Sequence, residues 1–303
     1  MPFGLDQVHS YLIETGDGWV MIDSGFPTRQ GLGLLEQEVT RICGDAERIK
    51  AVIVTHWHPD HSGLAGWLEE HGAEIILHRL DWESLDRMRA ENPFEDAVYA
   101  DHPIRHIAET INFSWEDMRH LREVDVPIEN PRLVDGDAEI EIGGRRLKLI
   151  WTPGHTEGHL CVLDTDTNVL FSGDHVLGRI TPHIGLWHDT TTSALHEYER
   201  SLRVVAGLAP ARALPAHESE VDDVAARVEE LLDHHQQRRE MVLNSLSDSP
   251  KTAPDVVGEV FRPLDEPVQK FLAMSETLAH LEALVVEGLV EPVAGEAPAY
   301  RLK

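Results

Sequence analysis

Short apolar runs in the first 78 residues alternate with stretches of helical spacing. Residues 11–25, YLIETGDGWVMIDSG, predict two strands joined by a Gly-Asp-Gly turn. The run IKAVIVT at 49–55 is continuous and apolar, which is typical of a strand buried on both faces. Helical spacing follows at 31–42 and 62–72, and another strand at 73–78. We therefore expect alternating strands and helices in this part of the chain.

The pattern changes twice further along the chain. Residues 79–126 are polar and predict several short helices, which we interpret as a helical insertion. From Arg132 the strand pattern returns, with Gly and Asp pairs at the turns. We place a domain boundary near residue 222, so that 1–222 form one domain and 223–303 a linker helix with a second domain. The remaining elements are expected as helices at 193–208, 221–246, 253–261 and 276–292, a strand at 211–218 and a hairpin at 291–302.

Composition limits the classes of function. The 303 residues include 26 basic and 54 acidic side chains, which gives a net charge of −28. Such a charge repels nucleic acid and anionic membranes. The two cysteines, Cys43 and Cys161, are far apart and without metal-like spacing, so we expect a reducing, cytoplasmic compartment. No apolar run approaches the roughly 20 residues that span a bilayer.

The loop after the strand 49–55 carries the chemistry. In THWHPDH, His56 and His58 share one side of an extended backbone, while Asp60 and His61 follow where the chain turns into a helix. Three further ligand-type residues each follow a predicted strand: His155, Asp174 and His217. Because the carboxyl ends of such strands form the usual catalytic crevice of α/β folds, we expect these side chains to meet at a metal site.

This set of motifs resembles the metallo-β-lactamase superfamily, and specifically its glyoxalase II-like hydrolases. The resemblance implies an α+β fold, a four-layer αβ/βα sandwich with the site on its rim. It also implies a first metal bound by His56, His58 and His155, and a second bound by Asp60, His61 and His217, with Asp174 bridging. Asp23 matches an aspartate that orients a ligand histidine. Ala216 and Glu218 flank His217 where the family usually has glycines.

The ligand set suits two Zn²⁺ ions and tolerates Fe or Mn. We expect a metal-bridging hydroxide to attack an activated acyl substrate. Asp60 would orient this hydroxide, and Asp23 and Asp60 are the two carboxylates expected to take part in catalysis. A thiolate leaves without a proton, which favours thioesters, esters or lactones over amides. An iron-dependent sulfur dioxygenase and a non-enzymatic metal-dependent scaffold stay as alternatives.

Residues 235–303 resemble the winged-helix tail of β-lactamase-like-2 type proteins. Those relatives include endoribonucleases, so RNA cleavage is the main rival function. The span between Lys270 and Arg301 has no Lys or Arg but five glutamates, so we expect no nucleic acid and no membrane partner. The apolar stripe Leu278, Leu281, Leu284 and Val285 is interpreted as the core of this domain. The expected partner is a small acyl substrate, and a homodimer stays open.

The insertion at 79–126 carries aromatic and basic side chains close to the metal loop in chain order. Isolated short helices are marginal, so this segment must pack against something. One interpretation is a helical layer over the edge of the sandwich. The other is a lid over the substrate pocket, with Tyr99, Arg105 and Trp115 as the residues that contact substrate.

Overall fold

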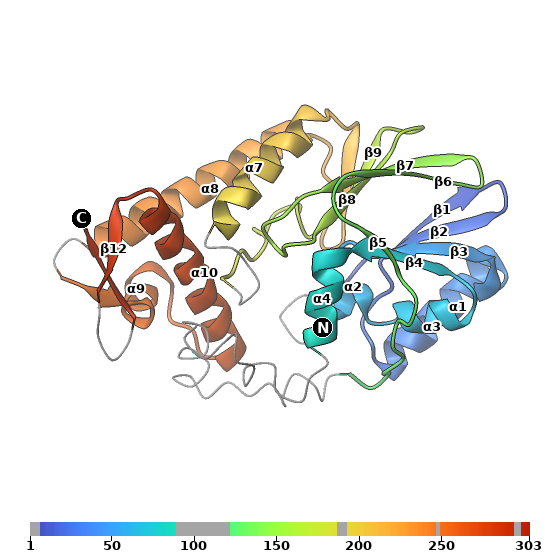
Figure 1. Cartoon of the computed structure of the whole chain (residues 1–303), viewed down its shortest axis with the longest axis horizontal. Helices are drawn as coiled ribbons and strands as arrows, with labels where there is room; N and C mark the ends of the chain where they lie inside the picture. Colours follow the sequence, from blue (N-terminus) through green and yellow to red (C-terminus); the bar gives the residue numbers. More distant parts are fainter. Residues whose placement is uncertain (1–6, 89–121, 187–192, 247–248, 294–297) are drawn as a thin grey trace.

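The computed structural model describes residues 7–88, 122–186, 193–246, 249–293 and 298–303 (Figure 1). Its first sheet has the order β1-β2-β3-β4-β5, with an antiparallel β1–β2 hairpin and parallel pairs thereafter. The strands are β1 (Tyr11–Thr15), β2 (Gly18–Ile22), β3 (Ile49–Ile53), β4 (Glu74–His78) and β5 (Arg132–Val134). The helices of this half are α1 (Arg29–Cys43), the 3-10 turn η1 (Ala46–Arg48), α2 (Pro59–Ser62), α3 (Ala65–Glu70) and α4 (Arg79–Arg87).

A second sheet has the order β10-β9-β8-β7-β6. Its strands are β6 (Ala138–Ile142), β7 (Arg145–Trp151), β8 (Leu160–Asp164), β9 (Val169–Gly173) and β10 (Arg212–Pro215). Helices α7 (Ala194–Gly207) and α8 (Val224–Ser245) accompany it. Because β7–β8 and β8–β9 are antiparallel and β9–β10 are parallel, the strands β7, β9 and β10 run in the same direction.

Three apolar cores separate the layers. Residues such as Ile53, Ile76 and Leu149 pack between the two sheets. A second core joins the outer face of the first sheet to α1, α3 and α4. A third joins the outer face of the second sheet to α7 and the first half of α8, through residues such as Tyr198 and Leu231. The predicted four-layer α+β sandwich is therefore confirmed.

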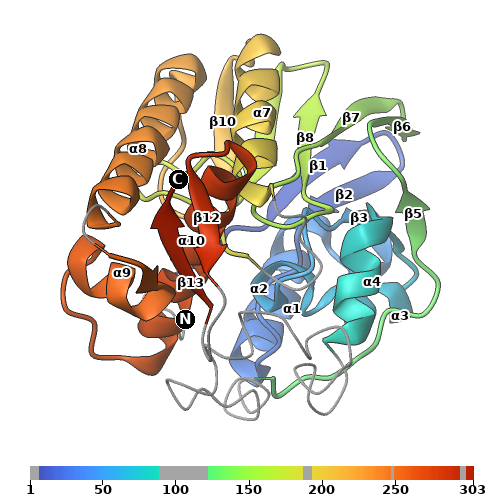
Figure 2. The same ribbon diagram turned by 60° about the vertical axis from the view of Figure 1, so that its left-hand side comes forward.

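The C-terminal part has its own core, which includes Leu278, Leu281 and Leu284 as expected. It contains β11 (Lys251–Thr252), α9 (Ala253–Val260), α10 (Pro267–Val286), β12 (Val290–Val293) and β13 (Ala299–Leu302). The hairpin β12–β13 and β11 form a three-stranded sheet beside these helices (Figure 2). Val242 and Leu246 at the end of α8 also belong to this core, so one helix packs into both parts of the chain.

Several boundaries differ from the sequence prediction. Helix α10 begins nine residues before the expected Glu276, at Pro267, because proline is favoured in the first turn of a helix. It ends at Val286 rather than Pro292, and the last residues expected in it belong to strand β12. Residues 122–126, expected within the helical insertion, lie outside any helix or strand. Among the described residues of that insertion, α4 is the only helix. Segment 124–128 instead packs on α3, where Val126 O lies 2.1 Å from the point at which a Cβ on Gly66 would stand. No helix in the described part of the chain is long and apolar enough to cross a bilayer.

A charged network ties α7, α8 and α10 together. The Arg239 guanidinium on α8 pairs with Glu199 on α7 and with Glu287 at the end of α10. His196 on α7 also contacts Glu287, with 2.9 Å between Nε2 and Oε1. The Arg239 side chain is only 11% exposed, so these ion pairs are shielded from solvent more than ordinary surface pairs are.

Candidate metal centre

Seven ligand-type side chains converge at one rim of the sandwich. His56 and His58 follow β3, and Asp60 and His61 lie on the single turn of α2. His155 lies between β7 and β8, Asp174 directly follows β9, and His217 follows β10. Since the contributing strands of each sheet point the same way, their carboxyl ends meet at this rim. The structure thus brings together all seven residues that the sequence predicted.

The first group consists of three imidazoles. His56 Nε2 lies 3.0 Å from His58 Nδ1, and His155 Nε2 lies 3.1 Å from His58 Nδ1 and 3.3 Å from His56 Nε2. Three ring nitrogens in a triangle cannot all hydrogen-bond to one another. Tetrahedral Zn²⁺ with Zn–N bonds of about 2.0–2.1 Å would separate its ligand nitrogens by roughly 3.3 Å. The triangle therefore fits one face of such a coordination sphere.

The second group mixes imidazoles with carboxylates. Asp60 Oδ2 lies 3.4 Å from His217 Nε2 and 3.7 Å from His61 Nε2. Asp174 Oδ1 lies 3.4 Å from His217 Nε2 and 3.6 Å from His61 Nε2. The other oxygen of Asp174, Oδ2, faces the first group at 3.6 Å from His155 Nε2. One carboxylate therefore presents an oxygen to each group.

Buried polar atoms in this centre lack a hydrogen-bond partner. Within the described residues, His61 Nε2, His217 Nε2 and Asp174 Oδ1 are buried and unpaired. Buried polar groups are nearly always satisfied, and a site that takes up an ion is one of the accepted reasons for an exception. The same residues fall into overlapping groups whose potential ligand atoms lie within 4.8 Å of one another. The residues therefore fit divalent metal ions with nitrogen and oxygen ligands.

Hydrogen bonds hold the ligand rings in place. Asp23 Oδ2 accepts from His61 Nδ1 at 2.8 Å, while Asp23 Oδ1 accepts from the backbone N–H of Thr55 at 2.7 Å. His155 Nδ1 donates to His183 O at 2.7 Å, and His217 Nδ1 donates to Gln7 O at 2.8 Å. Each contact leaves Nε2 free to face the centre, which is the usual arrangement of metal-binding histidines. Asp23 thus contacts His61 as the sequence predicted.

Protonation differs between the two groups. Burial, reinforced by neighbouring imidazoles, keeps the pKa of His56 and of His58 well below 6.5. Burial also disfavours the charged form of His61, but Asp60, Asp174 and Asp23 outweigh it and raise the pKa of His61 to about 10. Burial likewise opposes ionisation of Asp60, yet His61 and His217 keep its pKa below the usual range.

Sequence reasoning missed two supporting residues. Asp81 on α4 is buried and joins the two loops of the first group, because its carboxylate accepts from Trp57 N at 3.0 Å and from Gly158 N at 2.7 Å. His159 Nε2 accepts from the backbone N–H of Asp174 at 3.2 Å. Asp81 lies three residues beyond β4, and a position just after a strand is the signal that identified the metal ligands. His159 had no signal beyond its place in GHTEGH.

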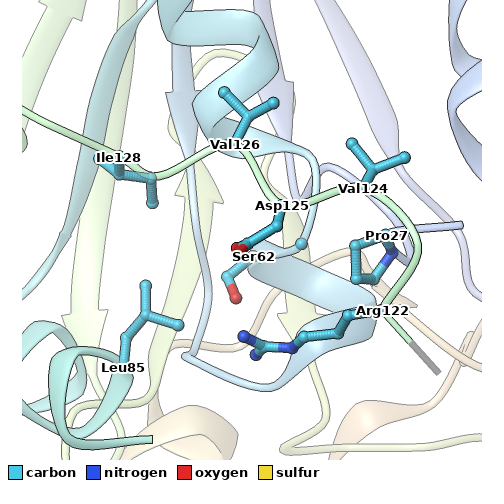
Figure 3. Close-up of a pocket in the computed structure, with 9 residues that line it drawn as sticks. Pro27, Ser62, Leu85, Arg122, Val124, Asp125, Val126 and Ile128 are labelled. Carbon is cyan, nitrogen blue, oxygen red and sulfur yellow. The ribbon is translucent and has the colours of Figure 1, made fainter. Parts of the chain in front are cut away.

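Two features flank the metal centre, Glu218 beside His217 and a small cavity beside α2. Glu218, where the resemblance implies a glycine, turns its carboxylate to the backbone N–H groups of Arg179 and Ile180 at 2.6 and 2.9 Å. A cavity of about 20 Å³ lies between α2 and segment 122–128, where Ser62, Leu85 and Arg122 line it (Figure 3). That volume holds about one water and no substrate. The predicted substrate contacts Tyr99, Arg105 and Trp115 lie outside the described residues.

Comparisons with known proteins agree with this geometry. Over 293 residues, the chain is 27% identical to a Beta-lactamase-like protein 2 homolog of Caenorhabditis elegans, which covers 96% of this chain and 82% of the relative. It is 27% identical to a probable metallo-hydrolase of Bacillus subtilis, over 94% of this chain and 90% of the relative. It is also 26% identical to an atrochrysone carboxyl ACP thioesterase of Aspergillus fumigatus, over 80% of this chain and 61% of the relative.

Solved structures and family matches extend the comparison. A metallo-beta-lactamase family protein of Thermus thermophilus superposes with a TM-score of 0.86 at 32% identity, covering 100% of this chain and 96% of that one. Residues 240–303 match a family described as the metallo-beta-lactamase-like C-terminal domain. Residues 3–217 match the family described as the metallo-beta-lactamase superfamily. With the sandwich and the ligand cluster already in evidence, the chain belongs to the metallo-beta-lactamase superfamily.

Proposed function

We propose that this protein is a binuclear metal-dependent hydrolase that acts on an activated acyl substrate: a thioester, an ester or a lactone. His56, His58 and His155 would hold the first metal, and Asp60, His61 and His217 the second. Zn²⁺ suits this set of imidazoles and carboxylates, and Fe or Mn would also be accepted. Asp23 would act by positioning His61.

The observation that carries this proposal is the placement of Asp174. Its two oxygens face two separate ligand groups at 3.4–3.6 Å, and the oxygen on the side of the second group is buried and unpaired. A single-metal site would need only one of these faces. A carboxylate shared in this way is a typical feature of two-metal hydrolases.

The two cations would lower the pKa of a shared water toward about 7 and polarise the substrate carbonyl. Asp60 remains ionised, so it can accept a hydrogen bond from that water and orient it. We expect the leaving group to depart as a thiolate or alkoxide, because the motifs supply no further acid for an amine. The thioesterase named among the relatives supports an acyl substrate over RNA.

We also infer that residues 1–222 form the catalytic domain and that 223–303 form a linker helix and a winged-helix-like domain. The net charge of −28 favours a small-molecule partner over nucleic acid or a membrane. The two widely spaced cysteines favour a reducing, cytoplasmic compartment. A homodimer stays open. The lid role of Tyr99, Arg105 and Trp115 stays a prediction.

Metal content tests the first part. Protein purified without chelator is expected to contain close to two metal ions per chain by elemental analysis. His58→Ala should lose one of them together with activity. His71→Ala is a matched control, because that imidazole contacts Trp67 at its own helix, with Nδ1 2.7 Å from Trp67 O and the two ring centroids 4.1 Å apart. An unchanged metal content in His58→Ala would contradict the assignment of His58 as a metal ligand.

A substrate panel tests the reaction. It contains acyl-CoA and acyl-glutathione thioesters, lactones, bis(p-nitrophenyl) phosphate and single-stranded RNA. We expect turnover of at least one acyl compound and loss of that turnover in Asp60→Ala. Efficient RNA cleavage that depends on Asp60, with no acyl turnover, would reverse the proposal in favour of an endoribonuclease.

A further inference from the structure

The hydrogen bond that fixes His155 comes from a segment held by the C-terminal part of the chain. His183, whose carbonyl accepts from His155 Nδ1, places its ring on helix α10, with Nε2 3.1 Å from Ser275 Oγ. The backbone N–H of Leu186 donates to Ser275 O at 3.1 Å. Ser275 is completely buried. One residue of α10 therefore binds the 183–186 segment through both its side chain and its carbonyl.

The direction of the His183–Ser275 bond follows from the hydroxyl. Ser275 Oγ has a single proton and donates it to Leu272 O at 3.0 Å. In that arrangement the hydroxyl accepts from His183 Nε2–H. The contact holds the ring in position, because a rotated ring would lose it.

Packing leaves the segment little room to shift. Ile184 is buried in the core beside the second sheet, where Ala283 of α10 also packs. Leu186 is buried in the C-terminal core. Between them, a Cβ on Gly185 would stand 2.5 Å from His183 Nε2 and 3.0 Å from Ser275 Oγ. The His183 carbonyl therefore takes its position from α10 as well as from the sandwich.

We propose that Ser275 is a positioning residue for the first metal: it holds His183, and the His183 carbonyl sets the orientation of His155. The C-terminal part of the chain is thereby a structural component of the metal centre. This inference rests on the proposed function, which places a metal ion at His155. The hydrogen bond from His155 exists without metal, so the positioning can be tested separately.

The test compares two buried hydroxyls on one helix. Ser275→Ala removes the acceptor for His183. The control Thr277→Val removes a hydroxyl that only bonds to its own helix, Thr277 Oγ1 to Ala273 O at 2.8 Å. Gly185→Ala is a second disrupting variant that keeps Ser275. Metal affinity is measured by chelator competition on the full-length protein, and histidine Nδ1–H protons by ¹⁵N-edited NMR before and after metal is added.

We expect Ser275→Ala and Gly185→Ala to weaken one of the two metals by about tenfold, the scale seen when a partner of a ligand histidine is lost. The Nδ1–H signal of His155 should shift or exchange faster, while that of His217, which donates to Gln7 O, stays unchanged. Thr277→Val should behave as wild type. A split between His155 and His217 is not expected from general loosening of the fold.

Two results would overturn the inference. One is a wild-type His155 signal and wild-type affinity for both metals in Ser275→Ala. The other is an equal change at His155 and His217. If the wild-type protein bound fewer than two metals, the proposed function would fail, and the His155 signal of the metal-free variants would still decide whether Ser275 positions that ring.

Discussion

The two ligand groups of the metal centre use the same residue type in opposite protonation states. In the first group, burial lowers the pKa of His56, His58 and His155, so these rings are neutral without metal. In the second group, nearby carboxylates outweigh burial and raise the pKa of His61 to about 10. The difference shows that the number of adjacent carboxylates, more than depth, decides whether a buried histidine is charged.

Asp174→Asn should weaken metal binding at both ligand groups at once. The variant keeps the size of the side chain and removes the charge shared between them. Both metals should bind at least about 100-fold more weakly, since supporting residues alone can cost that much. Chelator competition and kcat/KM would measure this. Asp166→Asn, in the exposed β8–β9 turn, is the matched control, and a loss confined to one metal would contradict the shared role.

Asp81→Asn and Asp23→Asn should separate the groups. Asp81 joins the loops that carry the first group, so its variant should weaken the first metal by roughly 10–100-fold. Leaving its buried backbone donors without a carboxylate should also lower the free energy of unfolding by about 1–3 kcal/mol. Asp23→Asn should weaken the second metal, because Asp23 holds His61.

Selective ¹⁵N labelling of histidine assigns each loss to a group. Asp86→Asn, exposed on the same helix as Asp81, is expected to match wild type in both stability and metal affinity. If Asp81→Asn and Asp23→Asn weakened the same metal, the division into two separately supported groups would be wrong.

The pH dependence of metal binding should also distinguish the two groups, and its step of about tenfold per pH unit is the smallest change expected here. His61 is protonated near pH 7 in the metal-free protein, so the second metal must displace its proton. As the pH decreases, the affinity for that metal should fall about tenfold per pH unit for each proton that the metal displaces. The first group is already neutral and should show little change between pH 8 and 6. Calorimetry in buffers of different ionisation enthalpy would count the protons, and equal proton release at both steps would contradict the assignment.

The ligand set was predictable because its members follow strands. His56, His58, Asp60 and His61 form one motif, and each remaining ligand lies alone at the end of an apolar run. The same runs predicted strands and helices, while the four layers were implied by the resemblance to the superfamily. Sequence could not reveal the supports of these ligands in the same way, because His183 acts through a backbone carbonyl that any residue carries. Its partner Ser275 lies 92 positions away on another helix, and the pairing depends on how α10 docks.

The Arg239 network has a consequence for how the molecule comes apart. Its ion pairs join α7 and α10 through α8, and α8 also packs into the cores on both sides. Opening the C-terminal part alone would separate the buried Arg239 guanidinium from one of its two carboxylate partners and would divide a continuous helix between two apolar cores. Thermal melting should therefore be a single cooperative transition. A chain truncated near residue 222 should be poorly folded, rather than a smaller version of the enzyme.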